Sequence, residues 1–576
     1  MAAAKTDVAA TLEELESMRC TYGSGASTRC EQVLRRMGKL KLPDVAALIR
    51  YHDALLFLRA FPQSDEVARL ADRALKEMES HVAALLESGD AADVLDDESV
   101  SGIAGTTVSN TWTYDLARQL ASRHSAHLST DWDVDEHYRQ LGLTLPDCIP
   151  LLADDSYVEA DTPYRKWIHA ASGNAKSDLG WLLASIAALP VPAELCTSLY
   201  AGCGVSVAWN LSRSLASRTL ARRPVEKLFC HPEPLLQRKD VSLAKEMAAP
   251  PLRLKKLNRK EGRAIIDMVQ DAVTVRYREL QGTTYADASY LVQVDVGRGL
   301  QLFLWGLDPE WRLPLRGYYA GFALKNGVPV NYFEAIGMFE WMEVGFNTFY
   351  TYREGETAWI YSQYLRLLHQ IAGATCISVY PYQIGQDNEE AVKSGAFWFY
   401  RKLGFRPGRR DLLALTQREE ARMARDPAHR TSPQVLRKLA QGHIFFDFDT
   451  SRRGDWDTFS TRNLGLSVAE KMAADFGGSA VRMRRETGKR LGKILGVDIA
   501  NWNGRERRAF SDFAVTLSLV PDVRRWTSAA KSALVEIIRA KAGQDETQYL
   551  LLMQEHQPLR QAILGIGSKP DSAAGK

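Results

Sequence analysis

The sequence lacks several features that would place a protein in a special class. It has no Cys-x-x-Cys pair, and its seven cysteines are odd in number and widely spread over 576 residues. Both facts argue against a disulfide framework. No apolar run reaches the ~18 residues of a membrane-spanning helix, and residues 1–14 contain no apolar signal region. We therefore expect a cytoplasmic protein with reduced thiols and no membrane contact.

The sequence also lacks a large net charge, because 73 basic residues are balanced by 70 acidic ones. The net charge of +3 implies no overall attraction to nucleic acid or membrane. Residues 481–531 are an exception, with twelve Lys and Arg against five acids. This basic segment could contact the phosphates of RNA or of a phosphopantetheine carrier protein, although a solvated helix face would have the same composition.

The chain is too long for one hydrophobic core, and its pattern changes along its length. Apolar residues recur at helical spacing in 45–61 and in 67–86, whereas Phe, Tyr, Trp and Val dominate parts of 301–344. We expect a multidomain chain with an N-terminal helical region (1–95), a mainly helical region (106–250), a mixed α/β domain (251–415) and a basic helical C-terminal region (416–576).

Within the mixed domain, strands are predicted first and helices later. Asn326-Gly327 stands between two strand-like runs and is a strong signal for a tight hairpin. Strands are expected at 301–306, 317–324, 329–344 and 375–382, and helices at 358–371 and 388–403, the last ending at Gly404. The predicted fold class is α/β, with a mixed sheet core flanked by N- and C-terminal helical regions.

The most specific motif closes the second of these helices. It reads Ala396-Phe-Trp-Phe-Tyr-Arg-Lys-Leu-Gly-Phe405, and it resembles the A-x-x-F-Y-x-K-L-G-F motif of the GNAT (GCN5-related N-acetyltransferase) superfamily. The resemblance covers residues of about 250–415. It implies a thioester donor of the acyl-CoA type held between two splayed central strands, and an amine-bearing acceptor that attacks the donor directly.

The resemblance also implies a site for the donor's pyrophosphate at the start of the helix that follows the fourth strand. The family pattern there is Q/R-x-x-G-x-G/A, and the stretch Tyr352–Ala358 fits it incompletely, so the phosphate-binding loop is degenerate. Glu354 and Glu356 would oppose a pyrophosphate. The cofactor-binding residues that the resemblance implies are Arg353, Gly355, Thr357, Ala358 and Asn388, where Asn388 equally suits a helix N-cap.

The catalytic residues follow from the same comparison. Tyr400 matches the family's proton donor to the departing thiolate, although a core tyrosine would fit the aromatic run as well. A general base is expected among the acids of 331–348. If one unbroken strand holds them, Glu334 and Glu340 share a face and Glu343 lies on the other. Glu340 is the first candidate and Glu343 the second.

Other motifs are set aside. Metal ligands could come from His124, His127 and Asp131, together with the acids and His137 that follow. The same segment is also typical of an acidic loop before a helix. Asp447, Asp449, Asp455 and Asp457 match no calcium loop, and Gly202-Cys-Gly204 lacks the preceding strand of a nucleotide-binding turn. No metal is expected.

The sequence thus predicts an N-acyltransferase that uses an acyl-CoA-type donor, with acetyl-CoA itself left open. One alternative keeps the fold and takes the acyl group from aminoacyl-tRNA or an acyl-carrier protein. Another is a non-catalytic GNAT-like interaction scaffold.

Overall fold

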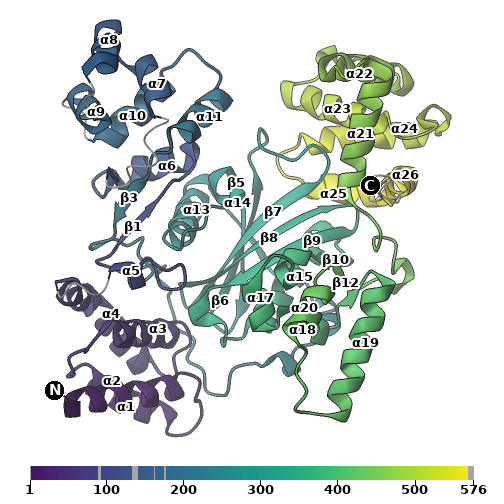
Figure 1. Ribbon diagram of the computed structural model, residues 1–576. Coiled ribbons are helices and arrows are strands. Elements are labelled where there is room, and N and C mark those ends of the chain that lie inside the picture. Colours follow the sequence, from purple (N-terminus) through teal and green to yellow (C-terminus); the bar gives the residue numbers. More distant parts are fainter. Residues whose placement is uncertain (1, 88–91, 133–140, 161–162, 174–176, 569–576) are drawn as a thin grey trace. The chain divides into compact units, whose positions relative to one another are not determined.

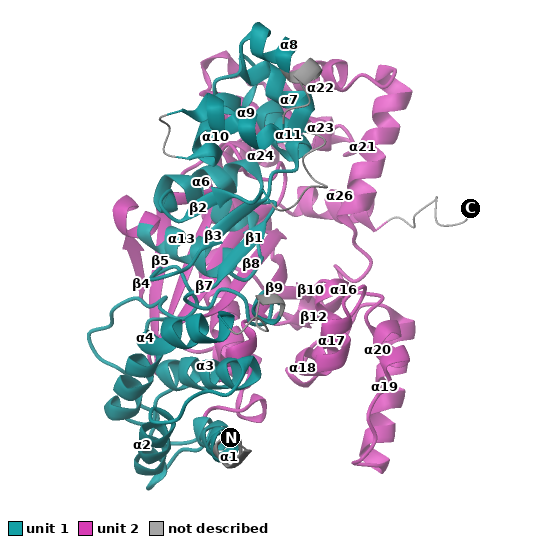
Figure 2. Cartoon of the chain, turned by 60° about the vertical axis from the view of Figure 1, so that its left-hand side comes forward, with its two compact units in different colours: residues 1–234, 264–284, 326–329 teal, residues 235–263, 285–325, 330–576 magenta. Residues whose placement is uncertain are grey.

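The computed structural model describes residues 2–87, 92–132, 141–160, 163–173 and 177–568. It divides into two compact units, shown in Figure 2. Unit 1 comprises residues 1–234, 264–284 and 326–329, and unit 2 comprises residues 235–263, 285–325 and 330–576. The four regions expected from the sequence stay a prediction. The α/β fold class is confirmed, because a mixed sheet and many helices are both present.

Unit 1 is mainly helical. Its two strongest sequence patterns form α3 and α4, and the side chains of Asp44 and Ser64 cap them by accepting from the N–H groups of Ala47 and Val67. Its helices are α1 (Ala2–Arg19), α2 (Ala26–Met37), α3 (Val45–Ala60), α4 (Asp65–Leu86), α5 (Ala92–Leu95), α6 (Tyr114–His124), α7 (Leu141–Cys148), α8 (Leu151–Ala160), α9 (Tyr164–Ser172), α10 (Asp178–Ala187), α11 (Ala193–Cys203), most of α13 (Arg259–Thr274) and α14 (Gln281–Thr284).

A small antiparallel sheet completes unit 1. Its strands are β1 (Thr107–Asn110), β2 (Leu128–Thr130) and β3 (Val207–Asn210), in the order β1-β3-β2. Trp209 of β3 is fully buried in a core that includes Trp112 and Tyr200. This core packs α6, α7, α9, α10 and α11 around the sheet.

Unit 2 is built on a nine-stranded sheet with the order β11-β12-β10-β9-β8-β7-β6-β5-β4 (Figure 1). Its strands are β4 (Leu254–Leu257), β5 (Ala286–Gly297), β6 (Leu300–Leu307), β7 (Gly317–Lys325), β8 (Val328–Met338), β9 (Trp341–Thr348), β10 (Cys376–Val379), β11 (Arg406–Pro407) and β12 (Ile444–Asp447). β9 and β10 pair in parallel. The pairs β4–β5, β5–β6, β6–β7, β8–β9, β10–β12 and β11–β12 are antiparallel.

Two tight turns shape the centre of this sheet. The predicted Asn-Gly hairpin is confirmed: Asn326 (φ 50°) and Gly327 (φ 79°) both adopt positive φ between β7 and β8. The second turn was not predicted. Phe339 (φ 55°) and Glu340 connect β8 to β9, so the expected single strand over 329–344 is two antiparallel strands.

The helices of unit 2 surround the sheet and continue to the C-terminus. The predicted helix over 358–371 is α15, which is almost wholly buried, but the helix expected over 388–403 is broken at Gly395 (φ 67°) into α17 and α18. The helices are α12 (Leu243–Met247), α15 (Thr357–Ala372), α16 (Pro381–Ile384), α17 (Glu389–Ser394), α18 (Ala396–Lys402), α19 (Arg410–Arg425), α20 (Pro433–Leu439), α21 (Thr461–Phe476), α22 (Ala480–Leu495), α23 (Gly504–Leu517), α24 (Ser528–Lys541), α25 (Thr547–Glu555) and α26 (Gln557–Gly567).

Candidate functional site

A gap opens in the sheet of unit 2 where β9 parts from β10. The two strands pair at only three positions, which run from Trp341 opposite Cys376 to Glu343 opposite Ser378. β10 then ends, and Pro381 begins α16, while β9 continues to Thr348 without this partner. A cavity of about 350 Å³ lies at the open end, lined by Phe346, Asn347, Thr348, Arg353, Thr357, Gln383, Asn388, Glu390, Ala391, Ser394, Ala396, Phe399 and Tyr400.

α15 begins at this pocket with unsatisfied N–H groups. In the described part of the chain, the backbone N–H groups of Thr357, Ala358 and Trp359 have no protein acceptor, whereas that of Ile360 donates to the Glu356 carbonyl. Free N–H groups and the positive end of a 16-residue helix dipole favour an anion. Thr357 lines the cavity, so a ligand phosphate in the pocket could reach this helix terminus.

Glu356, one of the two acids expected to repel a bound pyrophosphate, directs its carboxylate to other groups than these N–H groups. Glu356 adopts the left-handed conformation (φ 48°), and its fully buried carboxylate accepts from Arg298 Nε at 3.0 Å, from Lys325 Nζ at 2.9 Å and from the Leu236 N–H. Burial lowers the pKa of Lys325 to about 8 against the opposing effect of Glu356. Glu354 is exposed. The Glu356 carboxylate is therefore engaged by Arg298, Lys325 and the Leu236 N–H, and not by the N–H groups of α15.

Arg353 and Asn388 lie on the pocket wall, as the resemblance implies. The Arg353 guanidinium lies 4.1 Å from the centre of the Tyr350 ring and forms an ion pair with Glu390 of α17. Asn388 is the N-cap of α17, where its Oδ1 accepts from the Ala391 N–H and its Nδ2 donates to the Tyr382 carbonyl. The cap role thus occupies both ends of the Asn388 amide. Gly355 and Ala358 belong to the same turn as Thr357 but do not line the cavity.

Tyr400 reaches the pocket from α18. Its side chain is 4% exposed and packs edge-on against Tyr361 and Phe405. The hydroxyls of Tyr361 and Tyr364 are buried without a described partner. Tyr400 lines the cavity, and its hydroxyl makes no hydrogen bond to a described residue. Burial raises the pKa of Tyr400. Its phenol is therefore neutral and free to donate a proton inside the cavity.

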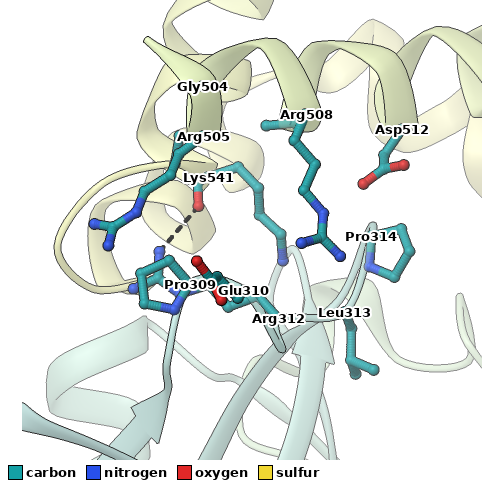
Figure 3. A pocket seen from close by; sticks show the side chains of 12 residues that line it. Pro309, Glu310, Arg312, Leu313, Pro314, Gly504, Arg505, Arg508, Asp512 and Lys541 are labelled. Carbon is teal, nitrogen blue, oxygen red and sulfur yellow. Dashed lines mark hydrogen bonds between the residues drawn. The ribbon is translucent and has the colours of Figure 1, made fainter. Parts of the chain in front are cut away.

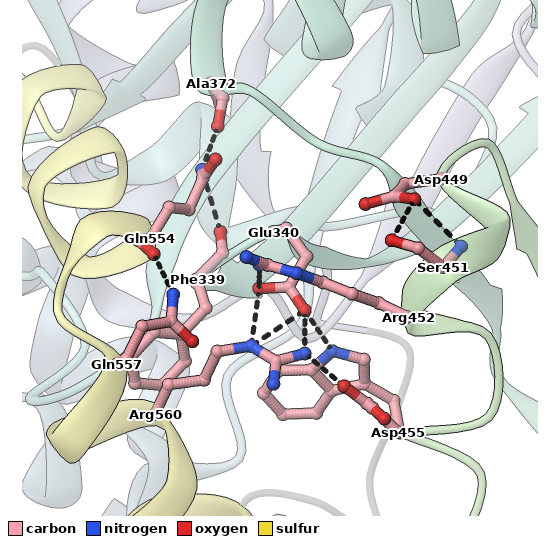
Figure 4. A network of polar contacts seen from close by, with 11 residues as sticks. Phe339, Glu340, Ala372, Asp449, Ser451, Arg452, Asp455, Gln554, Gln557 and Arg560 are labelled. Atoms are coloured by element: carbon pink, nitrogen blue, oxygen red, sulfur yellow. Dashed lines mark hydrogen bonds and ion pairs between the residues drawn. The ribbon is translucent and has the colours of Figure 1, made fainter.

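Glu340, the first candidate for the base, is not at this pocket. It lies in the turn that precedes β9, roughly 20 Å from Phe346 at about 3.3 Å per residue. Figure 4 shows its carboxylate between Arg560 and Arg452. Arg560 Nε lies 3.0 Å from both carboxylate oxygens, and Trp456 Nε1 donates at 2.9 Å. Burial acts to raise the pKa of Glu340, but these donors outweigh it and the pKa is lowered.

Glu343 is also removed from the cavity. It accepts from His443 at 2.9 Å, and Arg316 lies 3.7 Å away. The antiparallel register places Glu334, rather than Glu340, on the same sheet face as Glu343, because Glu334 is opposite Gly345 and Ile336 is opposite Glu343. The single unbroken strand that would have put Glu334 and Glu340 on one face is not present, because the turn at 339–340 reverses the chain.

Glu334 lies close to the pocket, and Glu390, an acid of the lining itself, is paired with Arg353. Residues directly opposite in a sheet have Cβ atoms about 5 Å apart, and a Cβ at Gly345 would lie 3.6 Å from the Nε2 of the pocket residue Gln383. Glu334 accepts from the Tyr318 hydroxyl and has no cationic partner among the described residues. Burial raises its pKa, and the Tyr318 hydrogen bond partly offsets that effect. Glu334 and Asn347 face the same side of the sheet.

The remaining sequence motifs have structural roles. His124 bonds to Asp271 at 3.0 Å, and residues 133–137 of the acidic segment lie outside the described residues. Asp447 and Asp457 pair with Arg406, and Gly204 (φ 60°) ends α11 in the left-handed conformation. Among the described residues no group of three His, Cys, Asp or Glu could hold a metal ion.

The basic segment contributes to a second cavity of about 300 Å³ in unit 2. Figure 3 shows Arg505 and Arg508 extending from α23 above the 309–314 loop, with Lys541 beside them. Arg312 fixes this loop by donating to the carbonyls of Lys541, Gly543 and Gln544. Arg505 and Arg508 are both exposed. The segment therefore presents cations to solvent here, and its RNA or carrier-protein contact stays a prediction.

Comparisons with protein-family models, with curated proteins and with solved structures found no match. Among the residues that the structure describes, no helix is both long and apolar enough to cross a membrane.

Proposed function

We propose that unit 2 is an acyltransferase that moves an acyl group from a thioester donor of the acyl-CoA type to an amine. The observation that supports this most is the coincidence of three features in one pocket. These are the gap between the parallel strands β9 and β10, the free N–H groups at the start of α15, and the unbonded hydroxyl of Tyr400. The GNAT resemblance of residues 396–405 implied all three.

The pocket suits a donor that carries phosphate at one end and a thioester at the other. The helix terminus at Thr357 and the guanidinium of Arg353 would meet the phosphates, and Tyr400 would meet the sulfur. Asn347 projects from β9 to the sheet face opposite to that of Phe346 and Thr348, so an acceptor can approach through the gap from that face. The thioester supplies the carbonyl carbon that the amine attacks.

Two side chains move the protons in this scheme. Glu334, on the Asn347 face, takes the proton that the amine loses as it forms the C–N bond, directly or through water. Tyr400 gives its proton to the thiolate that leaves as the C–S bond breaks, and it regains one from solvent. Glu334 replaces Glu340 and Glu343 as the proposed base, because both of these are bound to basic side chains away from the cavity.

The alternative donors differ in size. An aminoacyl-tRNA or an acyl-carrier protein would need contacts outside the cavity, and exposed cations such as Arg505 and Arg508 are suitable groups. We rank a non-catalytic scaffold last, because it would have no use for a buried carboxylate of raised pKa close to a cavity that is lined by an unbonded phenol.

The proposal is tested by measuring thiol release. The chain is incubated with acetyl-CoA and longer acyl-CoAs, each with a panel of primary amines, and free CoA is titrated over time. We expect amine-dependent release of CoA with formation of the amide. Release from acyl-carrier protein or deacylation of aminoacyl-tRNA, with none from any acyl-CoA, would favour the larger donors. No transfer from any of them would contradict the proposal.

Gly355→Asp should weaken CoA binding at least about tenfold, because it adds a carboxylate in the turn that leads to the free N–H groups of α15. Gly355→Ala is the matched control, since it adds bulk without charge, and it should lower CoA affinity much less. Titration calorimetry with CoA measures both. Equal affinities for Gly355→Asp and the parent chain would remove this loop from the donor site.

Glu334→Gln should lower kcat/KM by about 10²–10⁴ and leave donor affinity nearly unchanged. In the parent chain, kcat/KM should fall with decreasing pH through a pKa above the usual value of about 4.3, because burial raises the pKa of this base. Glu343→Gln is the control and should retain the parent profile. A parent-like pH profile in Glu334→Gln would show that another group is the base.

A further inference from the structure

Unit 1 contains a cavity that the proposed acyl transfer does not use. It has a volume of about 610 Å³ and lies between the end of α6, the segment 213–224 and α13. Small-molecule sites are typically cavities of about 300–1,000 Å³, so its size suits a ligand of moderate mass.

The cavity is strongly basic. Its lining contains Arg123, Arg213, Arg222 and Arg223 together with two histidines, and Asp271 is the one acid among the described residues that line it. Asp271 is fully engaged, because its Oδ1 accepts from Arg123 at 2.8 Å and its Oδ2 lies 3.0 Å from His124. The Asp271 charge is therefore neutralised within the wall. Arg123 also lies 3.3 Å from Asp267, so the positive charge left to attract an anion comes mainly from the exposed Arg213.

Residues outside the cavity lining contact these basic side chains and fix their positions. Arg123 also bonds to Gln270 at 2.6 Å, and the His124 ring packs 4.8 Å from Trp209. Arg222 is paired with Asp72 of α4. Such anchoring lowers the entropy that a ligand contact would cost.

Arg213 is the most exposed of the arginines, and its backbone is unusual. It adopts the left-handed conformation (φ 54°), which is unfavourable for a non-glycine residue, and its N–H donates to the Glu79 carboxylate at 3.1 Å. Its guanidinium makes no ion pair or hydrogen bond with any described residue. A side chain whose backbone is fixed and whose guanidinium makes no described contact is suited to bind a ligand.

One wall of the cavity is apolar. Leu215 is 79% exposed, and Ile265, Met268 and Leu220 lie with it along the lining. A bare inorganic anion would leave this wall in water, whereas a ligand with an apolar body would cover it.

We infer that this cavity binds a small phosphate monoester with an apolar body, the phosphate on the arginines and the body on Leu215. A dianionic phosphate suits the guanidinium groups of this lining better than a monoanionic carboxylate does. This inference does not depend on the proposed acyl transfer.

Titration calorimetry with phenyl phosphate tests it, with inorganic phosphate, phenol and benzoate as comparison ligands. We expect one saturable site that binds phenyl phosphate at least tenfold more tightly than any of the other three. Arg213→Asn should weaken it at least tenfold while folding normally, because Asn tolerates the left-handed conformation. Leu215→Ser should weaken phenyl phosphate several-fold and leave inorganic phosphate unchanged.

Two control variants locate the binding. Arg165→Gln alters an exposed arginine of α9 that does not line the cavity, and Arg353→Gln alters the pocket of unit 2. Both should bind phenyl phosphate as the parent chain does. The inference is overturned if phenyl phosphate does not saturate by roughly 10 mM, if phenol or benzoate binds as tightly, if Arg213→Asn retains parent affinity, or if only Arg353→Gln loses binding.

Discussion

Replacing Tyr400 with phenylalanine should lower the turnover of a thioester donor at least about tenfold, and by up to about 10⁴. The ring would keep its contacts with Tyr361 and Phe405. Only the hydroxyl is lost, and it makes no hydrogen bond to a described residue, so the free energy of unfolding should change by less than about 1 kcal/mol. Donor affinity should be nearly unchanged, because the thiolate needs the proton only as it leaves.

Tyr361→Phe is the matched control. Its hydroxyl is buried without a partner, so its removal should leave turnover unchanged and the fold equally or slightly more stable. Turnover and urea denaturation are measured for both variants. If Tyr400→Phe loses several kcal/mol of stability, Tyr400 is a structural residue. If it loses neither stability nor turnover, the proton-donor role is wrong.

Glu340→Ala should destabilise the chain by about 3–5 kcal/mol, because it leaves a buried guanidinium without its main counter-ion. The side chain of Arg560 is 2% exposed and would keep only the half-exposed Asp455 as a partner. Trp456 would also lose the acceptor of its indole N–H. Because the pKa of Glu340 is lowered by folding, its contribution is present above about pH 4.3 and is lost as the pH falls through its folded value.

The control is the exposed pair of Glu389 and Arg437, which has two well-formed hydrogen bonds of 2.8 Å. Glu389→Ala should leave the urea midpoint unchanged, because solvent screens this pair. A Glu340→Leu, Arg560→Met double variant should recover most of the lost stability, since no buried charge remains. A Glu340→Ala midpoint as little affected as that of Glu389→Ala would show that the network contributes nothing to folding.

The parts of unit 2 that the sequence predicted correctly depend on local chemistry. The turn at Asn326-Gly327 was recognisable because both residue types tolerate positive φ. α15 was recognisable because its apolar positions follow a helical period. The position of Tyr400 in a short helix closed by Gly404 (φ 106°) is local as well.

The parts that were missed depend on contacts between distant residues. The turn at Phe339 contains neither Gly nor Asn, and it is held by Gln554, which donates to the Phe339 carbonyl, and by Arg560, 220 positions from Glu340. Without that turn the face of Glu334 could not be assigned. The ion pairs that bind the Glu356 carboxylate could not be predicted from the sequence either, because Arg298 and Lys325 come from distant parts of the chain.

The central claim is that the pocket between β9 and β10 binds the thioester donor, and a thermal-shift panel with acetyl-CoA, longer acyl-CoAs and free CoA tests it most directly. A ligand at about 100 times its Kd adds roughly 2.7 kcal/mol to the free energy of unfolding. The account predicts a clear rise in Tm with at least one of these ligands, abolished in Gly355→Asp at the same concentration. No shift with any of them, or an equal shift in Gly355→Asp, would contradict it.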